Sequence, residues 1–254
     1  MRSMTGCTKD KALEESPRRA AEARRSGPRS SRALSYGLFS RLFQGGFRAA
    51  FALVCLLCAV DVARAEPPRV VVVGDSLSAG LGLAGDDAFP SQLGRRLRAD
   101  GVEVVMVNAA VSGDTTAGGL ARLDFALADG ADLVILELGA NDMLRGTNPE
   151  ITRANLAKMI EQCQARGARV LLAGMVASGN FGPDYKRAFD AVFPDLAKRH
   201  GLPFYRFFLE GVAGDAAMVL PDGLHPSPAG VARIVEGVAP LVEKTLAGLR
   251  AVHK

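Results

Sequence analysis

The sequence predicts an α/β domain of three layers, with a parallel five-stranded sheet between two layers of helices. Along residues 66–254, five apolar runs alternate with segments of helical periodicity. The first four runs are almost unbroken stretches of Val, Ile, Leu, Met or Ala, which is typical of parallel strands covered on both faces. Strands that alternate with helices in this way place the helices on both sides of one sheet.

Five strands and five helices are expected along the chain. The predicted strands are 69–73, 102–108, 133–137, 169–174 and 203–208. The predicted helices are 89–99, 118–127, 149–166, 184–200 and 228–249. In such a sheet a ligand binds beyond the carboxyl ends of the strands. The residues that carry chemistry should therefore come directly after the strands.

A serine follows the first strand, in the segment Gly74-Asp75-Ser76-Leu77-Ser78. Gly74 permits a sharp turn, and Ser76 would then lie near the start of a helix, where free N–H groups face a developing anion. A serine that merely caps this helix is the alternative interpretation. The segment is not the G-x-S-x-G turn of α/β-hydrolases, because position 78 is serine, and it lacks the G-K-[ST] of a P-loop.

Two potential hydrogen-bond donors follow the next two strands. Gly113 comes after the second strand and can present an unobstructed backbone N–H, although an ordinary turn glycine is the alternative. Asn141 comes after the third strand and can donate a side-chain N–H, although an ordinary turn asparagine is the alternative. Because both strand ends lie at the same edge of the sheet, we expect both donors in the pocket of Ser76.

A histidine and a carboxylate lie near the C-terminus, in the segment Asp222-Gly223-Leu224-His225-Pro226. A short D-x-x-H turn lets Asp222 accept from Nδ1–H of His225 and leaves Nε2 free, although an exposed loop histidine is the alternative. Taken together, the segments predict a serine hydrolase with Ser76 as nucleophile, His225 as base and Asp222 orienting that base. The N–H groups of Ser76 and Gly113 and the amide of Asn141 would stabilise the oxyanion.

The basic charge of the chain lies in its first 65 residues. They contain 12 Lys and Arg against 5 Asp and Glu, a net charge of +7, whereas residues 66–254 contain 19 against 22, a net charge of −3. A nucleic-acid-binding protein would need a basic patch on the folded domain, and the sequence there shows no such cluster. We therefore expect no nucleic-acid partner.

Residues 1–65 are predicted to be a disordered basic leader followed by a signal peptide. A positive flank with Arg41 and Arg48, an apolar run at 49–60 and the sequence Ala63-Arg64-Ala65 have the order that secretory signals share. We expect cleavage after Ala65, a mature domain at 66–254, and a periplasmic or secreted enzyme without stable membrane insertion. An uncleaved anchor is the alternative, although the run is shorter than the ~20 residues of a membrane span. The unusual length of the leader also suggests a translation start downstream of Met1.

These residues resemble the SGNH (GDSL) hydrolase superfamily, in its bacterial periplasmic thioesterase I/lysophospholipase/arylesterase branch. Its four blocks match Gly-Asp-Ser at 74–76, Gly113, Gly-x-Asn-Asp at 139–142 and Asp-x-x-His at 222–225. The resemblance spans the mature domain and implies a flavodoxin-like sheet, no metal or cofactor, and acyl esters or thioesters as substrates. It implies the same triad and oxyanion residues. Position 140 is Ala where some relatives have a second Gly. This difference leaves the resemblance intact, because the side chain at this position has no catalytic role.

Three functions remain open from the sequence. The first is an esterase, thioesterase or lysophospholipase acting on small to medium acyl groups. The second is a carbohydrate O-deacetylase with the same triad, and the third is a non-catalytic flavodoxin-like module that binds an anion. Leu77, Phe181 and Leu224 are candidates for an apolar wall of the substrate pocket, and the loop at 175–184 is a candidate lid. We expect a monomer or a weak oligomer.

Overall fold

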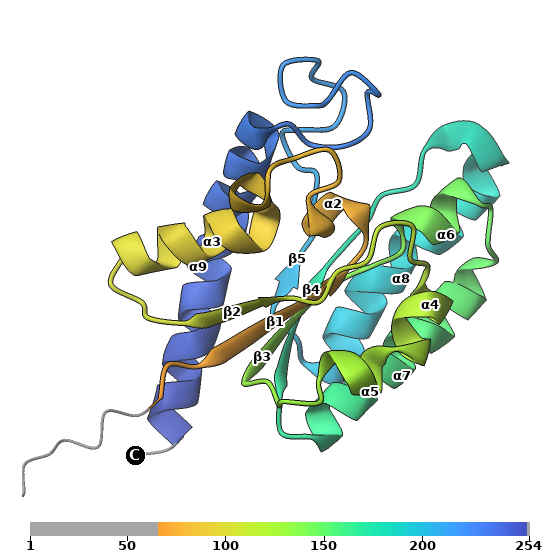
Figure 1. Ribbon diagram of the computed structural model, residues 1–254. Coiled ribbons are helices and arrows are strands. Elements are labelled where there is room, and N and C mark those ends of the chain that lie inside the picture. Colours follow the sequence, from red (N-terminus) through yellow and green to blue (C-terminus); the bar gives the residue numbers. More distant parts are fainter. Residues whose placement is uncertain (1–65, 253–254) are drawn as a thin grey trace, which may run out of the picture. The chain divides into compact units, whose positions relative to one another are not determined.

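The structure is a computed structural model that describes residues 66–252. Its centre is a five-stranded parallel sheet in the order β2-β1-β3-β4-β5 (Figure 1). The strands are β1 (Arg69–Gly74), β2 (Val105–Asn108), β3 (Leu133–Glu137), β4 (Arg169–Ala173) and β5 (Phe204–Tyr205). This arrangement confirms the predicted fold class. The predictions about the leader, its signal peptide and its cleavage concern residues outside the described part of the chain.

The predicted ends of the two edge strands were wrong. β2 was expected from 102 but begins at Val105, which pairs with Arg69, the first residue of β1. β5 was expected over 203–208 but contains only Phe204 and Tyr205, which pair with the last two residues of β4. An edge strand has one neighbour, so its length is set by the partner's register as well as by its own apolar residues.

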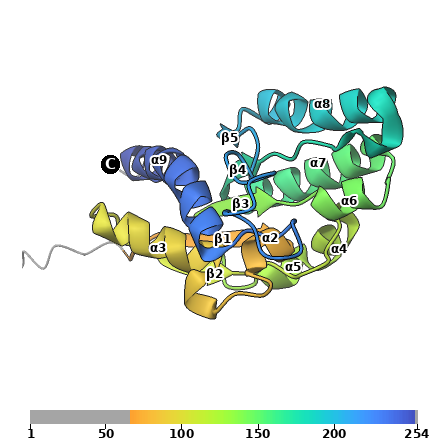
Figure 2. The same ribbon diagram turned by 90° about the horizontal axis from the view of Figure 1, so that it is seen from above.

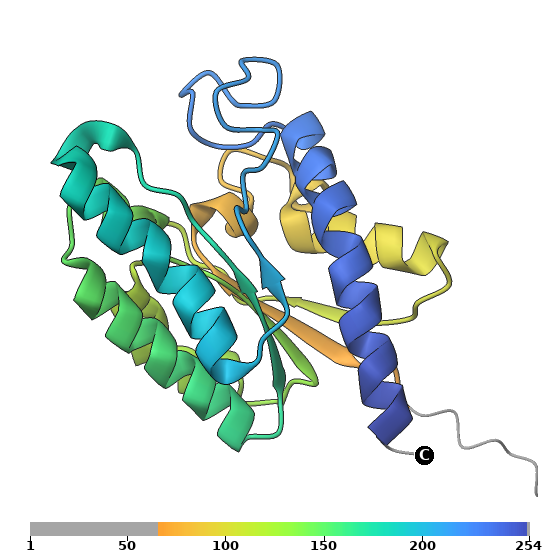
Figure 3. The same cartoon turned by 180° about the vertical axis from the view of Figure 1, so that it is seen from behind.

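Helices cover both faces of the sheet, as Figures 1 and 2 show. One face carries α3 (Phe89–Ala99) and the C-terminal α9 (Pro228–Val252), which lie side by side (Figure 3). The other face carries α4 (Thr116–Ala121), α5 (Leu123–Ala126), α7 (Pro149–Ala165) and α8 (Gly182–His200). Short helical turns complete the fold at α2 (Ser76–Ala79), η1 (Gly85–Asp87), α6 (Ala140–Leu144) and η2 (Gly179–Phe181).

The helix predicted at 118–127 is two helices. The break falls at Arg122, whose backbone leaves the helical conformation between α4 and α5 with φ −107° and ψ 5°. The periodicity of the apolar residues continues across this break, with Leu123 and Leu127 both buried. Periodicity alone therefore could not reveal that the chain turns there.

The hydrophobic core lies between the central strands and the helices. The side chains of Val70, Val71, Val72 and Val73 in β1 are completely buried, and so are those of β3. Each fully buried aliphatic side chain contributes roughly 1.5–3 kcal/mol relative to an exposed one. The rigid layer that results fixes where the strands end, and the candidate site lies beyond those ends.

Across residues 66–252, no helix combines the length and apolar character needed to cross a bilayer.

Candidate active site

The turn after β1 presents Ser76 at the carboxyl edge of the sheet. A Cβ atom on Gly74 would lie 2.1 Å from Ser78 Oγ and 2.6 Å from Glu137 Oε2, so only glycine fits at the end of this strand. Asp75 is the N-cap of α2, because its Oδ1 accepts from the N–H of Leu77 at 3.0 Å. The interpretation of Ser76 as a helix cap is therefore wrong, since Asp75 has that place and Ser76 is the first helical residue.

The loop before α9 brings His225 to Ser76. The distance from His225 Nε2 to Ser76 Oγ is 2.9 Å, and His225 Nδ1 lies 2.6 Å from Asp222 Oδ2. The backbone N–H of Leu220 donates to the carbonyl of His225 at 2.7 Å, which folds the loop back on itself. The three residues predicted as nucleophile, base and orienting carboxylate are thus in one hydrogen-bonded line.

The Asp222 carboxylate is held by its own loop. Its Oδ1 accepts from the backbone N–H groups of Leu224 at 2.9 Å and of His225 at 3.0 Å. These two bonds, together with the bond to the His225 ring, lower the pKa of Asp222 from 3.8 to about 2. Asp222 is therefore ionised over the whole neutral range and favours a proton on Nδ1 of His225, which leaves Nε2 free to accept from Ser76.

The two other predicted oxyanion donors lie next to this line. Gly113 has φ +85°, a backbone conformation that favours glycine, and its carbonyl accepts from Nη2 of Arg145 at 3.1 Å. The side-chain amide of Asn141 donates to Asp75 Oδ2 at 3.1 Å and to the carbonyl of Asp114 at 2.9 Å. Both N–H groups of Asn141 thus have protein acceptors, which fix the orientation of the amide.

These groups converge on one pocket of about 210 Å³. Its lining is Ser76, Leu77, Leu81, Gly113, Ala140, Asn141, Leu144, Leu224 and His225. The structure thus brings together all the predicted hydroxyl, imidazole and donor groups, with Asp222 behind the imidazole. It also places Leu77 and Leu224 in the wall, as the sequence analysis expected. Leu81 and Leu144 in the wall were not foreseen, because the sequence gives them no distinguishing neighbours.

Phe181 does not line this pocket. Its ring packs against Gly146, where a Cβ atom would lie 2.7 Å from Phe181 Cε1, and against the ring of Tyr185 at a centroid distance of 5.1 Å. The loop that carries it was expected to border the site because it follows β4. Instead the loop leads through η2 into α8, which draws Phe181 toward that helix.

The sequence model of the GDSL-like Lipase/Acylhydrolase family matches residues 72–233, which is more than half of the chain. The chain belongs to this family. The match confirms the predicted superfamily, and it includes every residue of the hydrogen-bonded line.

Two named relatives of this GDSL-like hydrolase are an esterase and an arylesterase. It is 42% identical over 193 residues to "Esterase TesA" of Pseudomonas aeruginosa, with 76% of this chain and 96% of that protein covered. It is 38% identical over 196 residues to "Arylesterase" of Vibrio mimicus, with 77% and 98% covered. The crystal structure of the psychrotrophic esterase EstA from Pseudoalteromonas sp., inhibited by monoethylphosphonate, superposes with a TM-score of 0.67 at 30% identity, covering 71% of this chain and 99% of that one. These likenesses confirm the enzyme class predicted from the sequence, an ester hydrolase.

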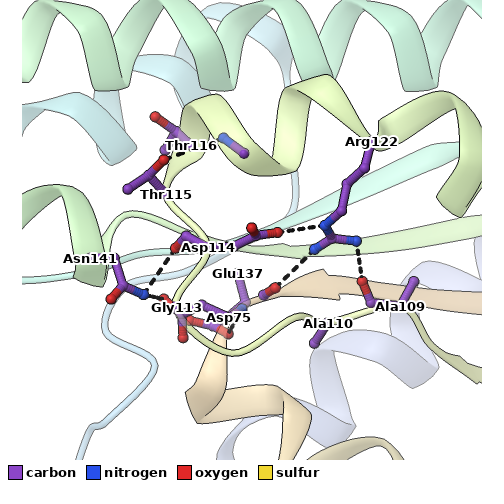
Figure 4. A network of polar contacts seen from close by, with 12 residues as sticks. Asp75, Ala109, Ala110, Gly113, Asp114, Thr115, Thr116, Arg122, Glu137 and Asn141 are labelled. Atoms are coloured by element: carbon purple, nitrogen blue, oxygen red, sulfur yellow. Dashed lines mark hydrogen bonds and ion pairs between the residues drawn. The ribbon is translucent and has the colours of Figure 1, made fainter.

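Two buried carboxyl groups, those of Asp75 and Glu137, lie close to each other at the end of β1, and neither was given a role from the sequence (Figure 4). Glu137 Oε2 accepts from Ser78 Oγ at 2.7 Å and from the backbone N–H of Asp75 at 3.3 Å. Burial raises the pKa of Glu137 well above its usual 4.5, and repulsion by Asp75 adds to this. Burial also raises the pKa of Asp75, to about 6. The sequence signal for Glu137 was a carboxylate at the end of an otherwise apolar strand.

Replacing Glu137 by glutamine is expected to change how stability depends on pH. The pKa of Glu137 is raised on folding, so the unfolded chain loses this proton first as pH rises above about 4.5. The contribution of Glu137 to the free energy of unfolding therefore falls with rising pH, and E137Q lacks this contribution. The difference in Tm, E137Q minus native, should increase between pH 5 and pH 8 in thermal unfolding followed by circular dichroism. E161Q, at an exposed residue of α7, is the control for the loss of a carboxylate at the surface, and a Tm difference for E137Q that stays constant with pH would contradict the prediction.

Within residues 66–252, no group of three or more His, Cys, Asp or Glu side chains is arranged to hold a metal ion. The expectation that this hydrolase needs neither metal nor cofactor stays a prediction.

Proposed function

We propose that this chain hydrolyses carboxylic esters or thioesters of small to medium acyl groups through an acyl-enzyme on Ser76. The observation that carries the proposal is the 2.9 Å contact of Ser76 Oγ with His225 Nε2, backed by the 2.6 Å contact of His225 Nδ1 with Asp222. A hydroxyl, an imidazole and an ionised carboxylate in this order form the arrangement that activates a serine for attack on an acyl carbonyl.

The reaction proceeds in two halves. Ser76 Oγ attacks the acyl carbon while its proton passes to Nε2 of His225, and the same proton then goes to the leaving alcohol or thiol. In the second half a water molecule attacks the acyl-enzyme, His225 takes the water's proton, and the acid leaves as Ser76 recovers its hydrogen. Asp222 stabilises the imidazolium in both halves without accepting its proton.

The oxyanion is proposed to bind the backbone N–H groups of Ser76 and Gly113 and the side-chain amide of Asn141. All three residues line the pocket that contains Ser76 Oγ. One N–H of Asn141 points to Asp75 Oδ2, so an oxyanion would compete with this carboxylate for the donor. Preorganised donors of this type are each worth about 10²–10³ in turnover.

The wall of the pocket favours an apolar acyl or aryl group. Leu77, Leu81, Leu144 and Leu224 surround the polar groups, and Leu81, Leu144 and Leu224 remain 39–49% exposed at the mouth. Burial of such surface against an apolar substrate is favourable by roughly 25 cal/mol per Å². The names of the Pseudomonas and Vibrio relatives, an esterase and an arylesterase, agree with this chemistry.

The carbohydrate deacetylase is the weaker alternative. The lining of the pocket contains four leucines and no Phe, Tyr or Trp ring on which a sugar could stack. The non-catalytic anion-binding module is not retained, because the chain belongs to a hydrolase family and its Asp222 and His225 are aligned on Ser76.

We further propose that the enzyme is exported and that its leader is cleaved after Ala65. The mature enzyme would then have no stable insertion in a membrane and would act as a monomer or weak oligomer.

Labelling by a fluorophosphonate probe followed by a substrate panel tests the function. The native protein should be labelled on Ser76, as peptide mass spectrometry would show, and S76A should stay unlabelled. S91A is the matched control, because the hydroxyl of Ser91 donates a hydrogen bond to the carbonyl of Gly85 and lies outside the pocket.

The panel compares p-nitrophenyl esters of increasing chain length, acyl thioesters and acetylated sugars. We expect kcat/KM for p-nitrophenyl butyrate to exceed that for acetylated xylose by at least about tenfold, since about 1.4 kcal/mol of apolar contact suffices for this ratio. A preference for the acetylated sugar would assign the deacetylase instead. Folded protein that is neither labelled nor active would refute the hydrolase proposal.

A further inference from the structure

Arg122 lies outside the pocket and yet contacts two of the segments that border it, the end of β1 and the loop between β2 and α4. The side chain leaves the break between α4 and α5 and runs back to the carboxyl edge of the sheet, with 22% of its surface exposed. Its Nε donates to Asp114 Oδ2, its Nη1 donates to the carbonyl of Ala109, and its Nη2 donates to the carbonyl of Gly74 at 3.1 Å (Figure 4). One guanidinium thus joins three separate acceptors.

The three acceptors belong to the two segments that carry the proposed oxyanion donors Ser76 and Gly113. Gly74 is the last residue of β1 and precedes Ser76 by two positions. Ala109 is the first residue after β2, and Asp114 directly follows Gly113. Because the guanidinium is planar and rigid, its contacts set the spacing between the turn of Ser76 and the loop of Gly113.

The third donor is connected through Asp114. The carbonyl of Asp114 accepts from Nδ2 of Asn141 at 2.9 Å, while its carboxylate pairs with Arg122. Gly118 leaves the space for this carboxylate, since a Cβ atom there would lie 2.7 Å from Asp114 Oδ1. The backbone N–H of Val111 also donates to the carbonyl of Gly74 at 3.0 Å, which ties the same two segments a second time.

We propose that Arg122 is a positioning residue that holds the N–H groups of Ser76 and Gly113 and the amide of Asn141 at the spacing the oxyanion requires. The inference rests on the proposed hydrolase function. Oxyanion donors lower the barrier only when their orientation is fixed before the reaction, because reorienting them would cost the energy they supply. A guanidinium reaches three acceptors in fixed directions, whereas the ammonium of a lysine is a single point on a flexible stem.

Loss of the guanidinium is expected to lower turnover more than substrate affinity. R122M should reduce kcat for p-nitrophenyl butyrate by about 10- to 100-fold, which is less than the loss of a whole oxyanion donor. KM should change by less than about threefold, since the leucines of the pocket wall stay in place. R122K keeps the charge, and it should also lower kcat more than it changes KM, with a smaller loss of Tm.

A boronic acid separates positioning from general stability. Butylboronic acid bonds to Ser76 Oγ and places a boronate oxygen where the oxyanion forms. If Arg122 positions the donors, the inhibition constant of this acid should rise in R122M and R122K in step with the fall in kcat. R153M is the matched control: Arg153 is 25% exposed and makes ion pairs with Glu150 and Asp195 on the outer helices. Its kcat and inhibition constant should equal those of the native enzyme.

Several results of these experiments would overturn the inference about Arg122. An active native enzyme with unchanged kcat in R122K and R122M would overturn this inference and leave the proposed function intact. A fall in activity that only matches the loss of folded protein, with an unchanged inhibition constant, would overturn it as well. Should R122M not fold, R122K decides by the same two measurements. A folded native protein that is neither labelled nor active would overturn the proposed function and this inference together.

Discussion

Replacing Ser76 by alanine is expected to lower kcat for ester hydrolysis by about 10⁵- to 10⁶-fold, the loss seen when a serine hydrolase loses its nucleophile. Ser76 Oγ lies 2.9 Å from the proposed base, His225 Nε2, and Ser76 is the only residue in the lining of the pocket that carries a hydroxyl, so no other lining residue can replace it. Burst and steady-state kinetics with p-nitrophenyl butyrate would measure the loss. The burst that reports the acyl-enzyme should disappear as well.

A double replacement provides the internal check. H225A alone should cost a similar factor, because the hydroxyl is a weak nucleophile without its base. Since the two residues act as one unit, S76A/H225A should be no slower than S76A within a factor of about three. Independent, multiplying losses would contradict a shared mechanism. Unchanged Tm values would show that the fold is intact in all three variants.

Replacing Asp222 by asparagine is expected to lower kcat by about 10³- to 10⁴-fold with the loop unchanged. The asparagine Oδ1 can still accept from the backbone N–H groups of Leu224 and His225. Its Nδ2, however, would face Nδ1 of His225 as a donor where Asp222 is an acceptor. The proton of the neutral ring would then move to Nε2, which could no longer accept from Ser76. Steady-state kinetics between pH 6 and pH 9 would measure the loss.

The same stretch of chain offers a matched control for D222N. Asp215 accepts from the backbone N–H of Ala217 at 2.9 Å in a similar turn, and the structure describes no histidine contact for it. D215N should therefore keep kcat within about twofold of the native value. If D222N also stayed within tenfold of the native enzyme, Asp222 would not be the group that orients His225.

The sequence was sufficient for the site residues that directly follow strands. Ser76, Gly113 and Asn141 could be found because a parallel sheet gathers the carboxyl ends of its strands at one edge. Asp222 and His225 could be found because both lie in one short segment whose spacing allows their contact. Their meeting with Ser76 across 149 residues is a property of the fold, and only the structure supplies the 2.9 Å distance.

The residues that could not be found from the sequence contact partners that no sequence pattern marks. Arg122 binds two backbone carbonyls, which lie 13 and 48 residues away and belong to residues of any type. Glu137 was predicted to end a strand, but its contact with Ser78 depends on how closely β1 and β3 approach at Gly74. Leu81 and Leu144 line the pocket only because the turn after α2 and the end of α6 lie at the same opening.

The loop of Asp222 and His225 has a consequence for how the enzyme becomes active during folding. The carboxylate is bound by N–H groups within its own four-residue turn, so base and orienting group can assemble locally, before the loop reaches the sheet. Within the line of Ser76, His225 and Asp222, tertiary structure then has only the separation between Nε2 of His225 and Oγ of Ser76 left to set. The three residues therefore align when this preformed turn docks on the sheet, and a displacement of the turn would separate His225 from Ser76 without breaking its bond to Asp222.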